Sequence, residues 1–207
     1  SEVKILKKMI SEGMSVARLN LSHGTIDEHK KHVSNARQAA KELSAPIGIL
    51  IDIPGPKYRV GKITGGSIDL KRGQKIVIGN ETDLNEKAIK LKVWPEGISK
   101  EVGKSKQIFL DDGLIKLSID SKIGKNIFCS VLNNANLKSN KSVTIPGSVN
   151  KLDYFTNETK DGLKFAKKVN ATFVGLSFIR NSNDIKKVKK FYSKSNFRPQ
   201  FVSKIEL

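Results

Sequence analysis

The sequence predicts an α/β protein whose parallel sheet is interrupted by an inserted all-β domain. Residues 47–53 (IGILIDI) form a short, nearly continuous apolar run, which is typical of a parallel strand buried on both faces. Helix and strand patterns alternate around this run with short links, as in consecutive βα units. From about Val60 to Ser142 the helical period is lost and short β-type runs replace it. We therefore expect a helix-covered parallel sheet with a small β domain inserted after one of its strands.

The N-terminal residues predict a helix. Ser1 can cap this helix, Glu2 would lie in its first turn, and Gly13 would end it. Its apolar stripe consists of Val3, Leu6, Met9 and Ile10.

The strand that follows, at residues 15–24, has one polar face. Arg18, Asn20 and Ser22 alternate with apolar residues, so the two sets face opposite sides of the strand. Because helix patterns flank the strand, the apolar side should face helices and the polar side should point into a site. Guanidinium groups bind phosphates, and neutral side-chain oxygens beside a carboxylate bind a monovalent cation. The alternative is an edge strand whose polar face is only hydrated.

A second helix and the inserted domain come next. Thr25 and Glu28 predict a capping box that opens a helix to about Ser44. His29 and His32 lie in this helix among charged residues, and we interpret them as surface residues. After the buried strand at 47–53, prolines and a glycine at 54–56 break the pattern. The β runs of the insertion, separated by turn signals, are 75–78, 89–93, 107–110, 114–119 and 127–132.

The α/β pattern returns after Pro146–Gly147. Thr156 can cap a helix to about Val169, with Leu163, Phe165 and Ala166 buried. A buried strand is expected at 172–178. Ser182 is the expected cap of the next helix, and the last strand is expected at 200–205.

The predicted strands all end in polar residues. Asp52 closes the second strand, Ser177 and Arg180 close the third, and Lys204 and Glu206 share a face at the end of the last. In a closed α/β barrel the carboxyl ends of the strands converge at one mouth, where site residues lie. Carboxylates can hold cations, and arginine and lysine can hold phosphate, so the set suggests phosphoryl transfer. The alternatives are a capping role for Asp52 and a solvated Lys204–Glu206 pair.

Composition narrows the class of protein. The 207 residues include 38 Lys and Arg against 20 Asp and Glu, a formal charge of +18. The basic residues are spread along the whole chain, so we interpret the charge as a solvated, lysine-rich surface suited to anionic metabolites, not as a nucleic-acid or membrane patch. The single cysteine, Cys129, excludes an intramolecular disulfide and favours a reducing, cytoplasmic location. No membrane-length apolar run or signal peptide is recognised.

The sequence resembles the pyruvate kinase family in several segments that keep that family's order and spacing. Together they cover most of the chain and are highly specific. They are GMSVARLNLSHG (13–24), LIDIPGPKYRVG (50–61), DDGLI (111–115), KSVTIPG (141–147), FVGLSFIR (173–180) and VSKIEL (202–207). The resemblance implies part of a (β/α)8 TIM-type barrel, about strands 2–5, with an inserted all-β lid domain. It divides the chain into barrel residues 1–57, lid residues 58–146 and barrel residues 147–207.

The resemblance also implies a glycolytic activity, the transfer of a phosphoryl group from phosphoenolpyruvate to ADP to give pyruvate and ATP. Arg18 and Lys204 would be catalytic, Arg18 on the substrate phosphate and Lys204 on the enolate, with Ser177 also at the substrate. Glu206 would be a ligand of Mg²⁺ or Mn²⁺. The implied nucleotide contacts are Asn20, Leu21, Ser22, His23, Arg59 and Lys141, and the implied monovalent-cation ligands are Asn20, Ser22, Asp52 and the Ile53 carbonyl.

The residue at position 57 departs from the family pattern. Many members have glutamate where this chain has Lys57. A fixed ammonium near the cation site could replace K⁺, so we expect weak or absent K⁺ dependence.

The chain is also short for the family fold. A barrel of this type needs about 250 residues, and the barrel part here is roughly 120. We therefore expect a piece of a larger enzyme that is inactive by itself, and the resemblance implies that this enzyme is a homotetramer. The alternatives are a barrel lyase that uses phosphoenolpyruvate or acyl-CoA, against which the inserted domain counts, and a basic β module that binds nucleic acid, against which the 6% aromatic content counts.

Overall fold

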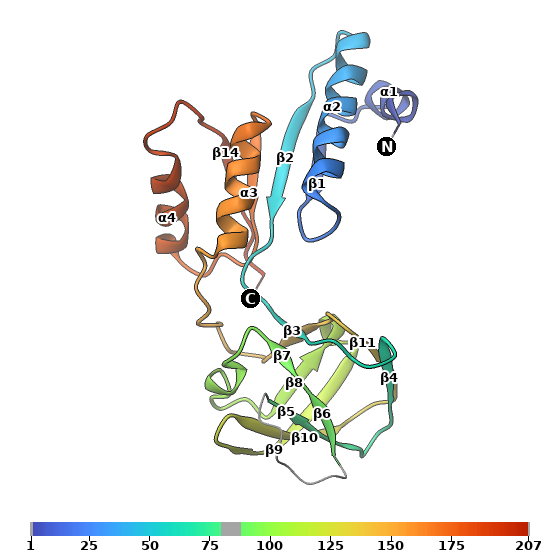
Figure 1. Cartoon of the computed structure of the whole chain (residues 1–207), viewed down its shortest axis with the longest axis vertical. Helices are drawn as coiled ribbons and strands as arrows, with labels where there is room; N and C mark the ends of the chain where they lie inside the picture. Colours follow the sequence, from blue (N-terminus) through green and yellow to red (C-terminus); the bar gives the residue numbers. More distant parts are fainter. Residues whose placement is uncertain (1, 80–87, 207) are drawn as a thin grey trace. The chain divides into compact units, whose positions relative to one another are not determined.

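The computed structural model describes residues 2–79 and 88–206, and these residues form two compact units (Figure 1). The first unit contains the residues up to Pro56 together with Asp153–Glu206, and the second contains Lys57–Leu152. We call them the α/β unit and the β unit. The chain leaves the α/β unit after one of its strands and returns to it through the next helix, which is the insertion that the sequence predicts.

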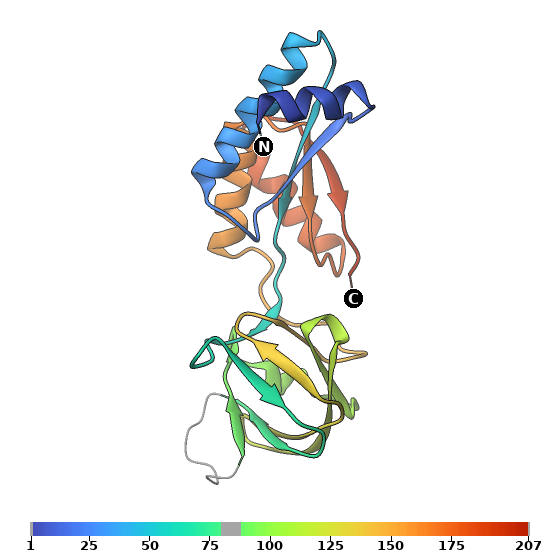
Figure 2. The ribbon, with the colours of Figure 1, turned by 90° about the vertical axis from the view of Figure 1, so that its right-hand side faces the viewer.

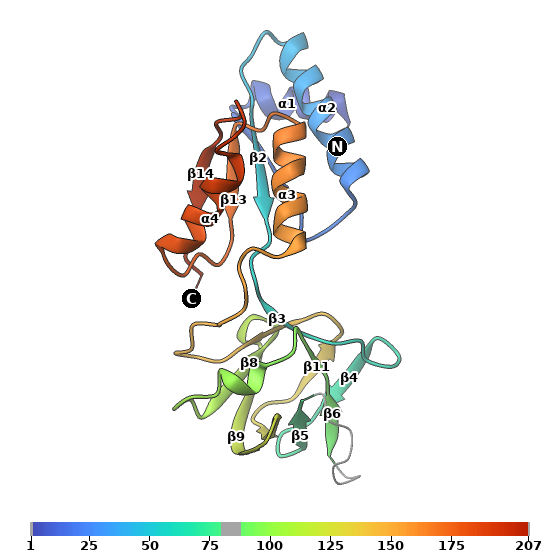
Figure 3. The ribbon, with the colours of Figure 1, turned by 60° about the vertical axis from the view of Figure 1, so that its left-hand side comes forward.

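The α/β unit is built on a parallel sheet with the order β1-β2-β13-β14. Neighbouring strands in this order are parallel throughout, and helices connect them (Figure 3). The strands are β1 (Val16–Asn20), β2 (Gly48–Ile53), β13 (Phe173–Leu176) and β14 (Gln200–Ser203), and the helices are α1 (Val3–Ser11), α2 (Ile26–Glu42), α3 (Asn157–Lys168) and α4 (Ser182–Tyr192). This repeated strand–helix order confirms the predicted α/β class and is that of part of a TIM-type barrel.

The core of the α/β unit lies between the sheet and its helices. Ile49, Ile51 and Ile53 of β2 are at most 1% exposed, because one face of β2 packs under the helices and both of its edges are paired. Each such side chain contributes about 1.5–3 kcal/mol by leaving water. On the opposite face, the register places Asn20, Asp52 and Gly175 in one row across three strands. Because side chains alternate along a strand, burying the isoleucines of β2 under the helices places Asp52 on the opposite face of the sheet.

The helix caps are predicted correctly at two of the helices. Thr25 accepts a hydrogen bond from the backbone N–H of Glu28, whose side chain returns to Thr25, so the capping box is confirmed. Thr156 caps α3 as expected. The expectation for α4 is wrong, because Asn181 and not Ser182 is the cap; its extended backbone lets the amide oxygen accept from two N–H groups of the first turn.

Three other expectations need correction. Glu2 is the N-cap of α1 and makes no side-chain capping bond, while Ser1 lies outside the described residues. His29 is buried, at 8% exposure, because the loop before α2 and Phe165 of α3 cover it. The last strand ends at Ser203, so Lys204 and Glu206 follow the strand instead of belonging to it.

The β unit is a sheet that curves round on itself (Figure 2). Its strand order is β6-β5-β10-β9-β8-β12-β3-β7, antiparallel except for the β5–β6 pair, and β4 pairs separately with β11. The bounds are β3 (Tyr58–Val60), β4 (Ser67–Leu70), β5 (Lys75–Ile78), β6 (Ile89–Leu91), β7 (Val93–Trp94), β8 (Gln107–Leu110), β9 (Ile115–Ile123), β10 (Asn126–Val131), β11 (Ala135–Lys138) and β12 (Ser142–Thr144). Short 3-10 helices lie at Ile98–Lys100 and Asp111–Gly113. The interior is filled by aliphatic side chains such as Ile108, Leu110, Leu117 and Ile127.

None of the helices in the described ranges is long and apolar enough to cross a bilayer.

Candidate functional site

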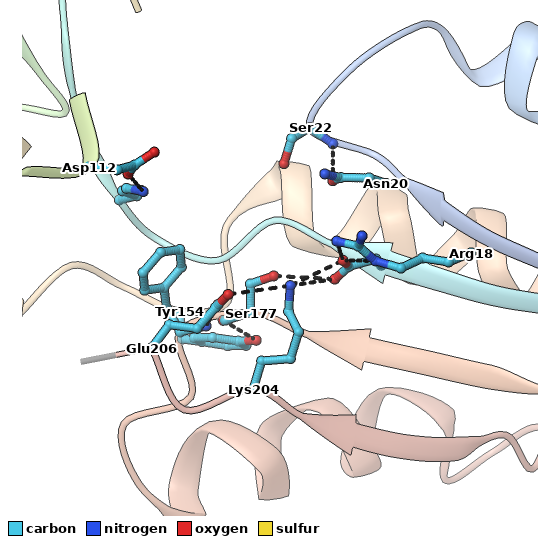
Figure 4. A network of polar contacts seen from close by, with 11 residues as sticks. Arg18, Asn20, Ser22, Asp112, Tyr154, Ser177, Lys204 and Glu206 are labelled. Carbon is cyan, nitrogen blue, oxygen red and sulfur yellow. Dashed lines mark hydrogen bonds and ion pairs between the residues drawn. The ribbon is translucent and has the colours of Figure 1, made fainter. Parts of the chain in front are cut away.

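The carboxylate of Asp52 is the centre of a polar cluster at the carboxyl ends of the parallel strands (Figure 4). Its side chain is 1% exposed. Arg18 of β1 donates from Nε and Nη2 to Oδ2 of Asp52, with the Nε distance at 2.8 Å. The Arg18 side chain itself remains 58% exposed. A guanidinium that is anchored on one side and open on the other can bind an anion from solution.

Lys204 approaches the same carboxylate from the other edge of the sheet. Its Nζ atom lies 3.0 Å from Oδ1 and 3.1 Å from Oδ2 of Asp52. Glu206 follows two residues later, with Oε1 3.6 Å from the Lys204 ammonium. The other Glu206 oxygen accepts the backbone N–H of Phe178 at 3.2 Å. Two cations and two carboxylates therefore meet at one rim, as the sequence predicts for the strand ends.

Ser177 and Tyr154 support this cluster from below (Figure 4). The Ser177 hydroxyl donates to Oδ1 of Asp52 at 3.3 Å, and the buried Tyr154 hydroxyl donates to the Ser177 carbonyl at 3.1 Å. Burial raises the pKa of Tyr154, so its hydroxyl stays a donor. Gly55 passes so close that a side chain there would overlap the Ser177 carbonyl. The segment after β13 is thus held by contacts with two distant parts of the chain.

Arg180 lies at the start of α4 and is held by Asp184. It donates from Nε and Nη2 to the Asp184 carboxylate at 3.1 and 3.0 Å, and its guanidinium lies 5.9 Å from the Tyr154 ring centroid. Both Arg180 and Asp184 side chains are almost fully buried. These bonds join the start of α4 to the segment that follows β13, and a role of Arg180 at the site stays a prediction.

The loop after β1 contains several sequence-predicted site residues. The Asn20 side-chain oxygen accepts the N–H of Ser22 at 3.0 Å, and the N–H of Leu21 donates to the Asp52 carbonyl at 3.0 Å. His23 follows in the turn. The Ile53 carbonyl, expected as a cation ligand, accepts the N–H of Ser177 at 3.3 Å. The oxygens of the expected cation set therefore lie at adjoining ends of β1 and β2.

Arg59 and Lys141 lie on neighbouring strand segments of the β unit. Arg59 of β3 pairs in register with Ser142, the first residue of β12, and Lys141 directly precedes Ser142. Arg59 donates to the Asn140 carbonyl at 3.0 Å, and Lys141 forms an ion pair with Asp111 at 2.9 Å. Because successive side chains of a strand point to opposite faces, the register does not bring the two side chains together.

Lys57 has a carboxylate partner in the β unit. Its Nζ atom lies 3.0 Å from Oδ1 of Asp112, which also accepts the Ser142 hydroxyl at 2.7 Å. These contacts, the Ser142 bond first, lower the pKa of Asp112 below its usual value. Asp111 and Asp112 both have positive φ, at 52° and 53°, a conformation that few non-glycine residues adopt. The Ser142 hydroxyl also accepts the Asp112 N–H at 2.8 Å and so stabilises this turn.

Comparison with known proteins identifies the family. A family model described as "Pyruvate kinase, barrel domain" matches residues 1–207. The chain belongs to the pyruvate kinase family. A pyruvate kinase of Thermococcus litoralis is 36% identical over 97% of this chain, one of Staphylococcus epidermidis is 33% identical over 98%, and one of Staphylococcus saprophyticus is 34% identical over 98%. The chain spans 42%, 35% and 35% of the length of these relatives.

In this member of the pyruvate kinase family, Tyr154 and Asp112 belong to the polar clusters, although sequence analysis gave neither residue a role. Tyr154 lies in an irregular segment before α3, where no periodicity marks it as buried. Asp112 lies in a quoted family segment, but only the folded chain shows that Lys57 and Ser142 contact it. The consecutive aspartates before a glycine signal a turn with unusual backbone angles, which is the one hint that the sequence offers.

Proposed function

We propose that the protein containing this chain transfers the phosphoryl group of phosphoenolpyruvate to ADP and forms pyruvate and ATP. The observation that carries the proposal is the convergence of Arg18 and Lys204 on the buried Asp52. In the reaction an oxygen of the ADP β-phosphate attacks phosphorus, the bond from phosphorus to the enol oxygen breaks, and the enolate takes a proton at carbon to become pyruvate. Such a transfer depends on positioning and on charge stabilisation, which fixed cations supply.

Each cation has a separate task in this proposal. Arg18, anchored through two nitrogens and 58% exposed, binds the phosphate of the substrate. Lys204 stabilises the enolate oxygen with its ammonium group, which is 27% exposed. Asp52 keeps both side chains in place and balances part of their charge while the site is empty. Ser177 fixes the orientation of the Asp52 carboxylate and borders the substrate.

Glu206 is the residue that would hold a divalent cation. Mg²⁺ is commonly bound by one or two carboxylates, with substrate oxygens and waters completing the shell. Among residues 2–79 and 88–206 no cluster of three His, Cys, Asp or Glu is present, so Glu206 fits as one protein ligand in a site that substrate completes. The bound ion would neutralise charge on the transferring phosphoryl group. The Phe178 N–H orients the Glu206 carboxylate for this role.

The nucleotide would contact the loop from Asn20 to His23 and the side chains of Arg59 and Lys141. A guanidinium and an ammonium can each bind phosphate oxygens. Closure of the β unit over the nucleotide would exclude water from the reaction.

Lys57 is proposed to replace the monovalent cation, with Asn20, Ser22, Asp52 and the Ile53 carbonyl as the surrounding oxygens. For this its ammonium has to leave Asp112, with which it pairs at 3.0 Å. We expect activity to be nearly equal with and without KCl and Lys57→Glu to create K⁺ dependence. Strong K⁺ activation of the unsubstituted protein would refute this part of the proposal. A homotetramer and a cytoplasmic location complete the proposal by family likeness.

The test is a coupled assay of pyruvate formation with the protein that contains this chain at its full length. Lys204→Met should lower kcat by about 100-fold or more and change KM for phosphoenolpyruvate little, since its ammonium acts on developing charge. Lys164→Met, on the exposed face of α3, is the matched control and should leave kcat unchanged. Equal kcat in Lys204→Met and the parent, or no Mg²⁺-dependent pyruvate formation by the parent, would overturn the proposed function.

A further inference from the structure

His29 is a buried histidine that the proposed mechanism does not use. It lies in the first turn of α2, immediately after the capping box, and is 8% exposed. Its Nε2 atom is 2.7 Å from the carbonyl oxygen of His23. The ring also packs against Phe165 of α3, with centroids 6.4 Å apart. The side chain therefore bridges the helix and the loop that precedes it.

The partner of Nε2 determines which ring nitrogen donates to the loop. A carbonyl oxygen can only accept, so Nε2 must carry the hydrogen of the bond to His23. Nδ1 is buried and has no hydrogen-bond partner within the described part of the chain. The bond from Nε2 is therefore the polar contact that directs the His29 ring at the loop.

The other contacts of the loop leave its second half dependent on His29. The first half is tied to β2 by the bond from the Leu21 N–H to the Asp52 carbonyl. Among residues 2–79 and 88–206, Ser22 bonds to the Asn20 side chain within the loop. The His23 N–H reaches the Asn20 carbonyl at a long 3.4 Å. The bond from His29 is the short contact that reaches this part of the loop from a rigid helix.

Gly24 confirms how closely the turn fits against α2. Its φ is +74°, which favours glycine, and an added Cβ would lie 3.0 Å from Oε2 of Glu28 and 3.6 Å from Nε2 of His29. The chain therefore crosses the start of the helix in direct contact with both side chains.

We propose that His29 is a positioning residue that holds Leu21–Gly24 in the conformation in which Ser22 and His23 can contact a nucleotide. The nucleotide part rests on the proposed function, whereas the holding of the loop does not. Replacing the donor removes the attachment of the His23 carbonyl to α2, and Ser22 and His23 then move independently of the sheet.

The experiment compares three variants of the chain. His29→Leu removes the donor, and His29→Gln keeps an N–H at a similar reach. His32→Leu is the control for the contact between the two rings, because the exposed His32 ring lies edge-on to that of His29, with centroids 6.4 Å apart. The readouts are amide hydrogen exchange of residues 22–24, exchange in β2 as a report on the core, and the affinity for MgADP by calorimetry.

We expect His29→Leu to raise the amide exchange rates of residues 22–24 at least tenfold while β2 stays protected. We also expect it to weaken the binding of MgADP about tenfold. His29→Gln should restore most of both effects, and His32→Leu should change neither. If His29→Leu does not fold, His29→Gln and His29→Asn carry the test, since the shorter asparagine cannot reach the His23 carbonyl and should behave as the loss of the donor.

The outcomes separate this inference from the proposed function. Unchanged exchange at 22–24 in His29→Leu, or an equal rise in His32→Leu, would overturn the positioning role. Raised exchange with rescue by Gln supports that role even if MgADP affinity does not change. An unchanged MgADP affinity would then contradict only the proposed contact between the loop and the nucleotide.

Discussion

The Nζ atom of Lys204 lies 3.0 Å from Oδ1 of Asp52, although the two residues are far apart in the chain and β13 lies between their strands. Gly175 of β13 stands in register with Asp52. A Cβ on this glycine would be 3.1 Å from Oδ1 of Asp52, so the missing side chain leaves the space over which the lysine reaches. A small residue in a central strand thereby lets an edge residue complete the cluster.

Asp52→Asn should strongly destabilise the α/β unit. The substitution leaves Arg18 and Lys204 facing each other across a neutral amide, and it removes the acceptor of several charge-assisted hydrogen bonds. We expect the free energy of unfolding to fall by about 3 kcal/mol, at the low end for a broken buried pair because Arg18 is largely exposed. The measurement is urea denaturation followed by circular dichroism.

Asp161→Asn is the control for this loss of charge. Asp161 pairs with Lys164 on the surface of α3, and both side chains are about two-thirds exposed. A change below about 0.5 kcal/mol is expected there. If the two variants are equally stable, Asp52 does not balance the charges of Arg18 and Lys204 as described.

Gly55→Ala should disturb the segment that carries Ser177. The new Cβ would overlap the Ser177 carbonyl oxygen and lie 2.8 Å from the carbonyl carbon, and backbone atoms cannot rotate away. We expect a loss of about 1–3 kcal/mol in the free energy of unfolding, as for overpacked sites. Gly103→Ala is the matched control, since an added Cβ there has nothing within 4 Å. The measurement is the midpoint of thermal unfolding of both variants. Equal midpoints would contradict the close approach of Gly55 to the Ser177 carbonyl.

Tyr154→Phe should lower the free energy of unfolding at neutral pH. It should also make the further decrease of this free energy at alkaline pH smaller. The hydroxyl donates to the Ser177 carbonyl, so its removal should cost about 1 kcal/mol. Burial raises the pKa of Tyr154 above its ordinary value. The neutral form is therefore favoured by folding, and its stabilisation is present below about pH 10 and is lost as the pH rises further. Urea titrations at increasing pH should show a smaller alkaline decrease in the free energy of unfolding for Tyr154→Phe than for the parent. The same pH dependence in both proteins would contradict this prediction.

Ser142→Ala should raise the pKa of Asp112. The Ser142 hydroxyl is the largest cause that lowers this pKa, with the Lys57 ammonium next. A carboxyl whose folded pKa is lowered adds stability above its ordinary pKa of about 4 and loses it as the pH falls through the folded value. Carbon-detected NMR titration of the Asp112 carboxyl measures the shift, and an unchanged pKa in Ser142→Ala would contradict the role of the hydroxyl. Asp120, which keeps its own Ser130 partner, serves as the internal reference and should not move.

The pattern of the sequence predicts most of the α/β unit and much of the cluster. Period-2 alternation at Arg18 and Asn20 and the apolar run ending at Asp52 identify strands whose ends carry polar residues. The carboxyl ends of parallel strands lie at one edge of the sheet, so the fold class predicts that Arg18, Asp52 and Lys204 lie in the same region. The roles proposed for these residues in catalysis stay predictions.

Two pairs of like side chains show what sequence pattern does not decide. Arg18 and Arg180 both follow polar strand patterns, yet one is anchored at the rim and the other is buried against Asp184. His29 and His32 are neighbours on one helix, yet only His29 meets the loop and Phe165. Local sequence is similar in each pair, and the difference lies in the element that packs against it.

By itself, the sequence determined the order of the strands and helices of the α/β unit, the inserted β domain and the Thr25 capping box, because periodicity and capping chemistry are local properties. Only the tertiary structure decided that Lys204 crosses β13 to reach Asp52, that Tyr154 donates to the Ser177 carbonyl, and that His29 contacts the His23 carbonyl. These contacts join residues far apart in the chain or depend on the exact packing around one side chain. Their geometry is therefore set by the register of the sheet and the packing of its helices, which no stretch of sequence specifies alone.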